Sequence, residues 1–134
     1  MAKNREPRTA PEVNWLDGAE EHDFPAAASY LSLLADASLV ETLVGRLRSG
    51  AATDHFKAKD LLRAAGLPLL PPTNPHVASD LAKVAKGAAL SPILLVRGDL
   101  SRGLPLQIAD GYHRVCACYH TDENLDLPAV LVDR

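Results

Sequence analysis

The sequence contains no run of about 18 apolar residues, the minimum for a helix that crosses a membrane, so no membrane span is predicted. Its first residues also lack the apolar core of a secretory signal. Cysteine is scarce. Cys116 and Cys118 stand two positions apart on a predicted helix, where their side chains point in different directions. We do not expect them to pair or to share one metal, and we expect a reduced, cytoplasmic protein in which both are buried.

The composition is otherwise typical of one globular domain. The chain has 134 residues, of which 47% are hydrophobic and 23% are charged, enough to enclose a single core. The beginning of the chain is the exception, because it is polar, contains proline and shows no apolar periodicity before about Trp15. We therefore predict a flexible tail over residues 1–22.

Charge is unevenly distributed along the chain. The net charge of −3 divides into −3 over residues 1–52, +3 over residues 53–120 and −3 over residues 121–134. The mildly electropositive middle suits a small anionic ligand. An acidic chain without a strongly basic domain argues against nucleic acid as the partner.

Residues 23–66 are predicted to form a helical N-terminal subdomain of three short helices. Asp23 is the expected cap of the first helix, and Ser38 with Glu41 three residues later forms a capping box for the second. The third is expected over residues 55–65. The leucine-rich hairpin of the first two helices could supply an interface for a homodimer or for a protein partner.

Residues 67–134 are predicted to form a second unit of helices and strands. The two middle strands can form a hairpin, and the last strand returns to the same sheet after a helix, so the sheet must be mixed. With helices packed on one face of it, the fold class is α+β. The expected elements are an extended segment over 67–72, a helix begun by Asn74-Pro75 and closed by Gly87, strands over 92–96, 104–109 and 127–132, and a helix over 111–120.

The segment from Asp110 to Arg114 carries the features of an anion-binding turn, in which a strand passes through glycine into a helix. The first N–H groups of a helix lack partners within the helix, and the helix dipole adds positive charge there. Gly111 allows a ligand to approach the backbone, Arg114 can hold a phosphate with two hydrogen bonds, and His113 can add a donor.

A helical wheel places Tyr112, Cys116 and Cys118 on an inward arc of this helix, and it places Asp110, His113, Arg114, Ala117 and His120 on an outward arc. An ordinary amphipathic surface helix capped by Asp110 would show the same pattern.

The stretch from Leu67 to Val132 resembles the ParB/sulfiredoxin superfamily in the order of its elements and in its Asp-Gly-x-His-Arg turn. In that superfamily the turn binds nucleotide phosphates: ParB-type members bind CTP, sulfiredoxins bind ATP, and a related group includes ADP-dependent free-serine kinases. The matching segments are Leu67-Pro68-Leu69-Leu70, Asn74-Pro75-His76, Pro92-Ile93-Leu94-Leu95-Val96, Ile108-Ala109-Asp110-Gly111-Tyr112-His113-Arg114 and Leu127-Pro128-Ala129-Val130-Leu131-Val132.

The resemblance implies that the chain binds a nucleoside di- or triphosphate together with Mg²⁺. Asp110 and His113 are the candidate catalytic residues, and Asp110 with Asp99 the candidate metal ligands. The candidate phosphate-binding residues are Gly111, Tyr112, His113, Arg114, His76 and Arg97.

Departures from the family pattern leave three functions open. Sulfiredoxins have a catalytic cysteine where this chain has Tyr112, and the serine kinases need a glutamate, whereas no glutamate occurs between Glu41 and Glu123. The first function is a nucleotide-dependent phosphotransferase or NTPase, and the second is a non-catalytic nucleotide-sensing or protein-interaction module. DNA binding, as in partition proteins, is the weakest because the chain is acidic and no DNA-binding helix-turn-helix follows the matching stretch.

Overall fold

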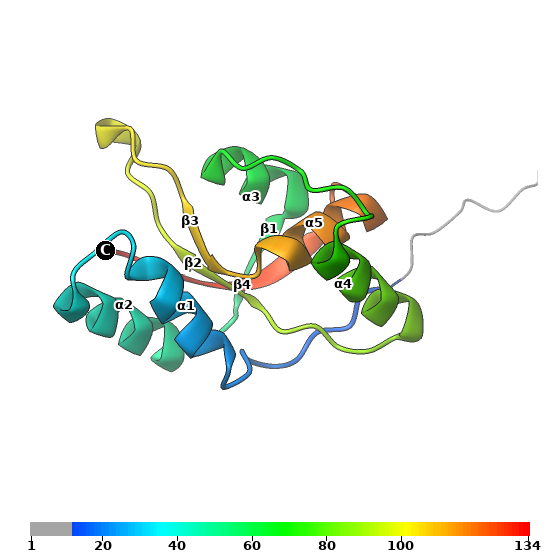
Figure 1. Ribbon diagram of the computed structural model, residues 1–134, viewed down its shortest axis with the longest axis horizontal. Helices are drawn as coiled ribbons and strands as arrows, with labels where there is room; N and C mark the ends of the chain where they lie inside the picture. The colour runs from blue at the N-terminus through cyan, green and yellow to red at the C-terminus, as the bar shows by residue number, and fades with distance from the viewer. Residues whose placement is uncertain (1–11) are drawn as a thin grey trace, which may run out of the picture.

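The computed structural model describes residues 12–134, which form five α-helices, one short 3-10 helix and a four-stranded sheet (Figure 1). The predicted α+β class is confirmed. Within the described residues no helix is both long and apolar enough to cross a membrane. The elements are α1 (Asp23–Leu31), α2 (Ala37–Ser49), β1 (Asp54–Lys57), α3 (Ala58–Ala65), α4 (Pro75–Lys86), β2 (Ile93–Val96), η1 (Leu100–Arg102), β3 (Gln107–Asp110), α5 (Tyr112–Thr121) and β4 (Asp126–Val132).

The sheet is mixed, as predicted, with the strand order β1-β4-β2-β3. β2 and β3 form the expected antiparallel hairpin, and β4 returns parallel to β2 after α5. β1 adds an antiparallel edge strand next to β4. The buried strand β2 therefore lies inside the sheet, which agrees with its continuous apolar sequence.

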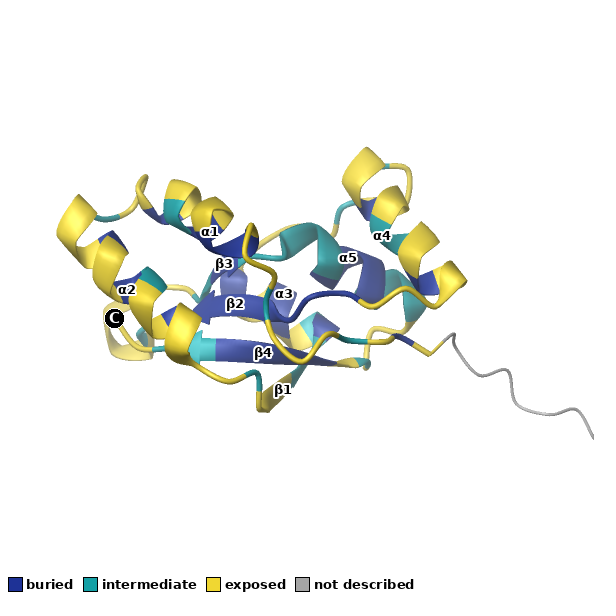
Figure 2. Ribbon diagram, turned by 90° about the horizontal axis from the view of Figure 1, so that it is seen from below, coloured by how far each residue is buried: buried dark blue, intermediate teal, exposed yellow. Residues whose placement is uncertain are grey.

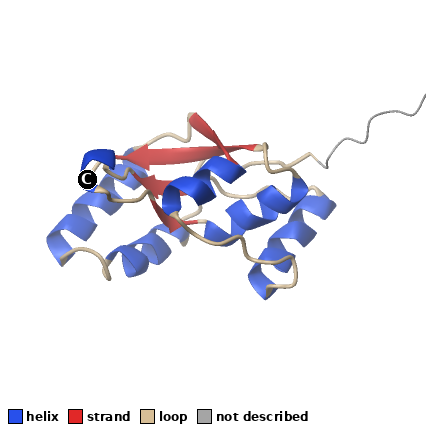
Figure 3. Ribbon diagram, turned by 90° about the horizontal axis from the view of Figure 1, so that it is seen from above, coloured by secondary structure: helices blue, strands red, loops and turns tan. Residues whose placement is uncertain are grey.

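Helices cover both faces of the sheet, so the prediction of helices on one face only was wrong. Successive residues of β2 alternate between two apolar clusters, with Ile93 in one and Leu94 in the other. The first cluster also contains side chains from α3, α4 and α5, and the second contains side chains from α1 and α2. Figure 3 shows the strands with helices on either side, which explains why the four residues of β2 are all apolar and buried.

The starts of three N-terminal elements differ from their predicted positions. The first helix is preceded by His22, and the Asp23 side chain accepts a hydrogen bond from the Glu20 N–H instead of capping the helix. The second helix is capped by Asp36, two residues before Ser38 of the predicted capping box. Residues 55–57, predicted as the first turn of the third helix, belong to strand β1, because they pair with β4.

The packed part of the chain begins before residue 23. Val13 is buried in the cluster that contains side chains of α3, α4 and α5, and Trp15 forms an isolated parallel bridge with Leu90. Figure 2 shows β2 and β4 as largely buried, whereas much of α2 and α4 is exposed. Residues 1–11 of the predicted tail lie outside the described residues. The predicted subdomains 23–66 and 67–134 share one sheet, because β1 of the first pairs with β4 of the second.

Candidate functional site

The turn after β3 is formed by Asp110, the last residue of the strand, and Gly111, which precedes α5. No described side chain caps α5, so its first N–H groups face the turn without that partner. α4 packs against α5 and begins as the sequence predicts, since the Asn74 side chain accepts hydrogen bonds from the N–H groups of His76 and Val77. The start of α4 thereby brings His76 to the turn.

A cavity of about 240 Å³ lies between α4 and the turn. Four of the residues that line it are predicted site residues, namely Asp110, Gly111, His113 and Arg114, and a fifth is His76. Ser79, Asp80 and Lys83 of α4 complete the lining. Side chains and N–H groups that can donate hydrogen bonds to a phosphate, from two helices and one turn, thus surround one cavity.

Arg114 is folded back into the protein instead of pointing outward as the helical wheel predicted. Its Nη2 donates to Asp110 Oδ2 at 2.9 Å and to the Pro92 carbonyl oxygen at 3.3 Å. Its side chain is only 15% exposed and that of Asp110 only 17%, and the buried Arg114 Nε has no hydrogen-bond partner among the described residues. The prediction that Ala117 faces outward was also wrong. Ala117 is fully buried because α3 and α4 cover α5.

The inward position predicted for Cys116 and Cys118 is confirmed, because both are buried and free, whereas Tyr112 is only partly buried. Burial raises the pKa of the Cys118 thiol to about 12. A thiol of this kind stays protonated at neutral pH and is a poor nucleophile. The cysteines are therefore packing residues of the helix.

Asp23 of α1 is a member of the site that the sequence did not reveal. Asp23 is only 2% exposed, and its carboxyl group is close enough to that of Asp110 to raise the pKa of Asp110. The pKa of Asp110 is raised, chiefly by burial, while Arg114 opposes the shift and Asp23 adds to it. No local pattern could have indicated this pair, because the two residues are far apart in sequence and meet only where α1 packs on β3.

We predict that Asp23→Asn lowers the pKa of Asp110, because it removes a neighbouring negative charge. A raised folded-state pKa contributes stability that is present below the unfolded value of 3.8 and is lost as the pH rises through the folded value. Asp23→Asn should therefore reduce the stability that is lost as the pH rises through the folded-state pKa of Asp110. Carboxyl ¹³C chemical shifts of Asp110 followed against pH would measure the change, and an unchanged Asp110 titration would contradict the proximity of the two groups.

Two histidines face each other at the mouth of the cavity. The rings of His76 and His113 have centroids 4.8 Å apart. Burial lowers the pKa of His113, and the neighbouring His76 lowers it further, so its ring is neutral at pH 7 and can donate through one nitrogen. The Asp80 side chain is only 13% exposed, and burial raises its pKa, although Lys83 opposes the shift from 3.8 Å away.

Three predicted site residues do not join this cavity. The Tyr112 hydroxyl donates to the Pro68 carbonyl oxygen at 2.6 Å, so its side chain packs against the segment before α4. Arg97 and Asp99 follow the end of β2, at the opposite end of the hairpin from Asp110, which pairs with Leu94 near the start of β2. The structure therefore does not bring Asp99 and Asp110 together as a metal site.

The chain was compared with protein families, curated proteins and solved structures, and it matches none of them.

Proposed function

We propose that the chain binds the phosphate groups of a nucleotide at the turn after β3, in the manner of ParB/sulfiredoxin-type proteins. The observation that carries this proposal is the convergence of His76, Lys83, His113 and Arg114 on one cavity at the uncapped start of α5. Cationic and imidazole donors beside free helix N–H groups form an environment that favours a phosphate.

The size of the cavity supports recognition of the phosphates rather than of the whole nucleotide. Pockets that enclose a ligand of nucleotide size have volumes of about 300–1,000 Å³, whereas this cavity has about 240 Å³. A diphosphate group fits such a space. The nucleoside would then lie on the surface, so discrimination between bases should be weak.

The acidic side chains of the cavity favour a phosphate that binds together with a cation. Asp80 and Asp110 neutralise Lys83 and Arg114, so a bare anion would compete with internal carboxylates. Mg²⁺ is commonly held by one or two carboxylates together with substrate phosphates. Asp110 and Asp80 are the carboxylates of the cavity and would take that role in place of Asp110 with Asp99, provided that Asp110 exchanges Arg114 for the ion. The ion would supply charge neutralisation for the phosphates.

Binding without catalysis is the second candidate, and the surroundings of Asp110 favour it. A general base needs a free carboxylate directed at the reacting proton. Asp110 is instead hydrogen-bonded by Arg114, and the neighbouring Asp23 raises its pKa. For phosphotransferase or NTPase activity, Asp110 would have to exchange Arg114 for substrate, with His113 as the remaining proton donor. Product analysis after incubation with the bound nucleotide separates the two candidates.

The proposal is tested by titration calorimetry with ATP, ADP, CTP and GTP, each with and without Mg²⁺. We expect binding that Lys83→Gln weakens about tenfold, because a charged hydrogen bond to phosphate is lost. Lys86→Gln is the matched control, since Lys86 lies in the same last turn of α4 but does not line the cavity. Absence of binding by every nucleotide, or equal losses in the two variants, would contradict the proposal.

A further inference from the structure

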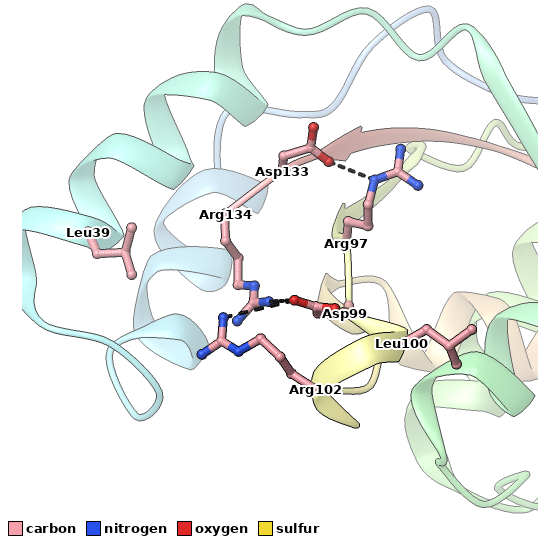
Figure 4. Close-up of a pocket in the computed structure, with 8 residues that line it drawn as sticks. Leu39, Arg97, Asp99, Leu100, Arg102, Asp133 and Arg134 are labelled. Carbon is pink, nitrogen blue, oxygen red and sulfur yellow. Dashed lines mark hydrogen bonds and ion pairs between the residues drawn. The ribbon is translucent and has the colours of Figure 1, made fainter.

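A second, larger cavity of about 800 Å³ lies at the end of the β2–β3 hairpin, opposite the turn. Arg97 follows β2, Arg102 lies in η1 and Arg134 follows β4, and all three line the cavity together with Asp99 and Asp133. Figure 4 shows Arg102 and Arg134 converging on Asp99 while Arg97 reaches Asp133. We call this set of residues, with the two leucines described below, the hairpin-end surface.

The hairpin-end surface has three arginines against two aspartates, and two of the arginines are held loosely. Arg102 and Arg134 share Asp99 at 3.9 and 3.7 Å, too long for good hydrogen bonds, and Arg97 uses its Nε on Asp133 at 2.6 Å. Arg46 of α2 donates to the Asp133 carbonyl oxygen and adds a further positive charge. These ion pairs are exposed, so they contribute little stability and can exchange with an incoming carboxylate.

Two leucines border the charged groups. Leu100 at the tip of the hairpin is 100% exposed, and Leu39 of α2 is also exposed while lining the same cavity. In Figure 4 the two lie on opposite sides of the Asp99 cluster. A fully exposed leucine beside guanidinium groups offers a peptide an apolar contact together with bidentate recognition of its carboxylates.

We propose that the hairpin-end surface binds an acidic peptide segment of a partner protein, with carboxylates on the arginines and an apolar side chain on Leu100. The local excess of positive charge complements such a segment, although the chain as a whole carries a charge of −3. A single inorganic ion would fill little of a cavity this wide. A nucleic-acid backbone would leave the leucines without contacts. The inference does not depend on nucleotide binding, because the two cavities share no residue.

The probe is a displayed library of random short peptides, selected on the full chain and followed by affinity measurements on the selected peptides. We expect the selected sequences to be rich in Asp and Glu and to contain Leu, Ile, Val, Met or Phe. Arg102→Gln should weaken their binding about tenfold, because a charge-assisted hydrogen bond is lost. Leu100→Ser should weaken it by a similar factor through lost apolar contact.

Each variant has a matched control elsewhere on the chain. Arg63 of α3 pairs with an aspartate three residues earlier at 3.9 Å, as Arg102 does, so Arg63→Gln should leave affinity within about twofold. Leu33 is 81% exposed but does not line the cavity, and Leu33→Ser serves the same purpose. Selection of neutral or basic peptides, equal effects of a variant and its control, or displacement of the peptide by a single-stranded oligonucleotide of equal charge would overturn the proposal.

Discussion

Arg114→Ala is expected to lower the free energy of unfolding at neutral pH by about 3 kcal/mol, because it leaves the Asp110 carboxylate in a poorly hydrated place without its partner. The two side chains are 15% and 17% exposed and joined at 2.9 Å, and Asp23 adds a second carboxyl group nearby. The same variant should abolish nucleotide binding, since the guanidinium is the strongest donor of the cavity. Chemical denaturation and calorimetry measure the two effects.

The control for this prediction is the double variant Asp110→Asn with Arg114→Ala. Removing both charges should recover part of the lost stability, because no charge then remains without its counterion. The penalty of Arg114→Ala alone should also shrink as the pH falls, because Asp110 can then take up a proton and become neutral. A loss below about 1 kcal/mol, typical of a surface pair, would contradict the role of Arg114 as the counterion of a buried carboxylate.

Gly111→Ala is expected to lower the free energy of unfolding by about 2 kcal/mol and to weaken nucleotide binding. The backbone has a φ of +112° at this position, a conformation that residues with a side chain rarely adopt. An added Cβ would lie 2.8 Å from Ile93 Cδ1 and 2.9 Å from Arg114 Nη2. The Cβ of alanine at position 111 would therefore displace the Arg114 guanidinium from its place in the cavity.

Gly103→Ala supplies the matched control for this effect. Gly103 also has a positive φ, +68°, but an added Cβ would meet nothing within 4 Å. The variant should destabilise the protein by only about 1 kcal/mol, the backbone contribution alone. It should leave nucleotide affinity unchanged, because it lies at the opposite end of the hairpin. Equal losses of stability in the two variants would show that crowding around Gly111 is unimportant.

Elements fixed by adjacent residues could be predicted from the sequence. Helix α4 begins at the Asn74-Pro75 pair and ends before Gly87, as expected, because its cap, its first residue and its C-terminal glycine act within one turn. Strand β2 was predicted because a short apolar run can be satisfied only by burial on both faces. The β1 strand was missed because its four residues become a strand only by pairing with β4, far along the chain.

The candidate site was predicted where it is local and missed where it depends on distant contacts. His113 and Arg114 belong to the turn itself, and His76 reaches it because α4 packs on α5. Arg97 and Asp99 were misplaced although the predicted hairpin already implied their position: in antiparallel strands the end of the first lies beside the start of the second. Asp23 could not be found, because its role depends on the burial of a carboxyl group against a strand more than eighty residues away.

The central claim, that the cavity at the turn binds nucleotide phosphates, is tested most directly by an NMR titration of the ¹⁵N-labelled chain with ADP and Mg²⁺. Backbone amide shifts report binding residue by residue, so they separate the two cavities. We expect the largest saturable shifts at the amides of Gly111 to Arg114, with smaller ones at His76 to Lys83. Shifts confined to the hairpin-end surface, or no saturable shift at the start of α5, would contradict it.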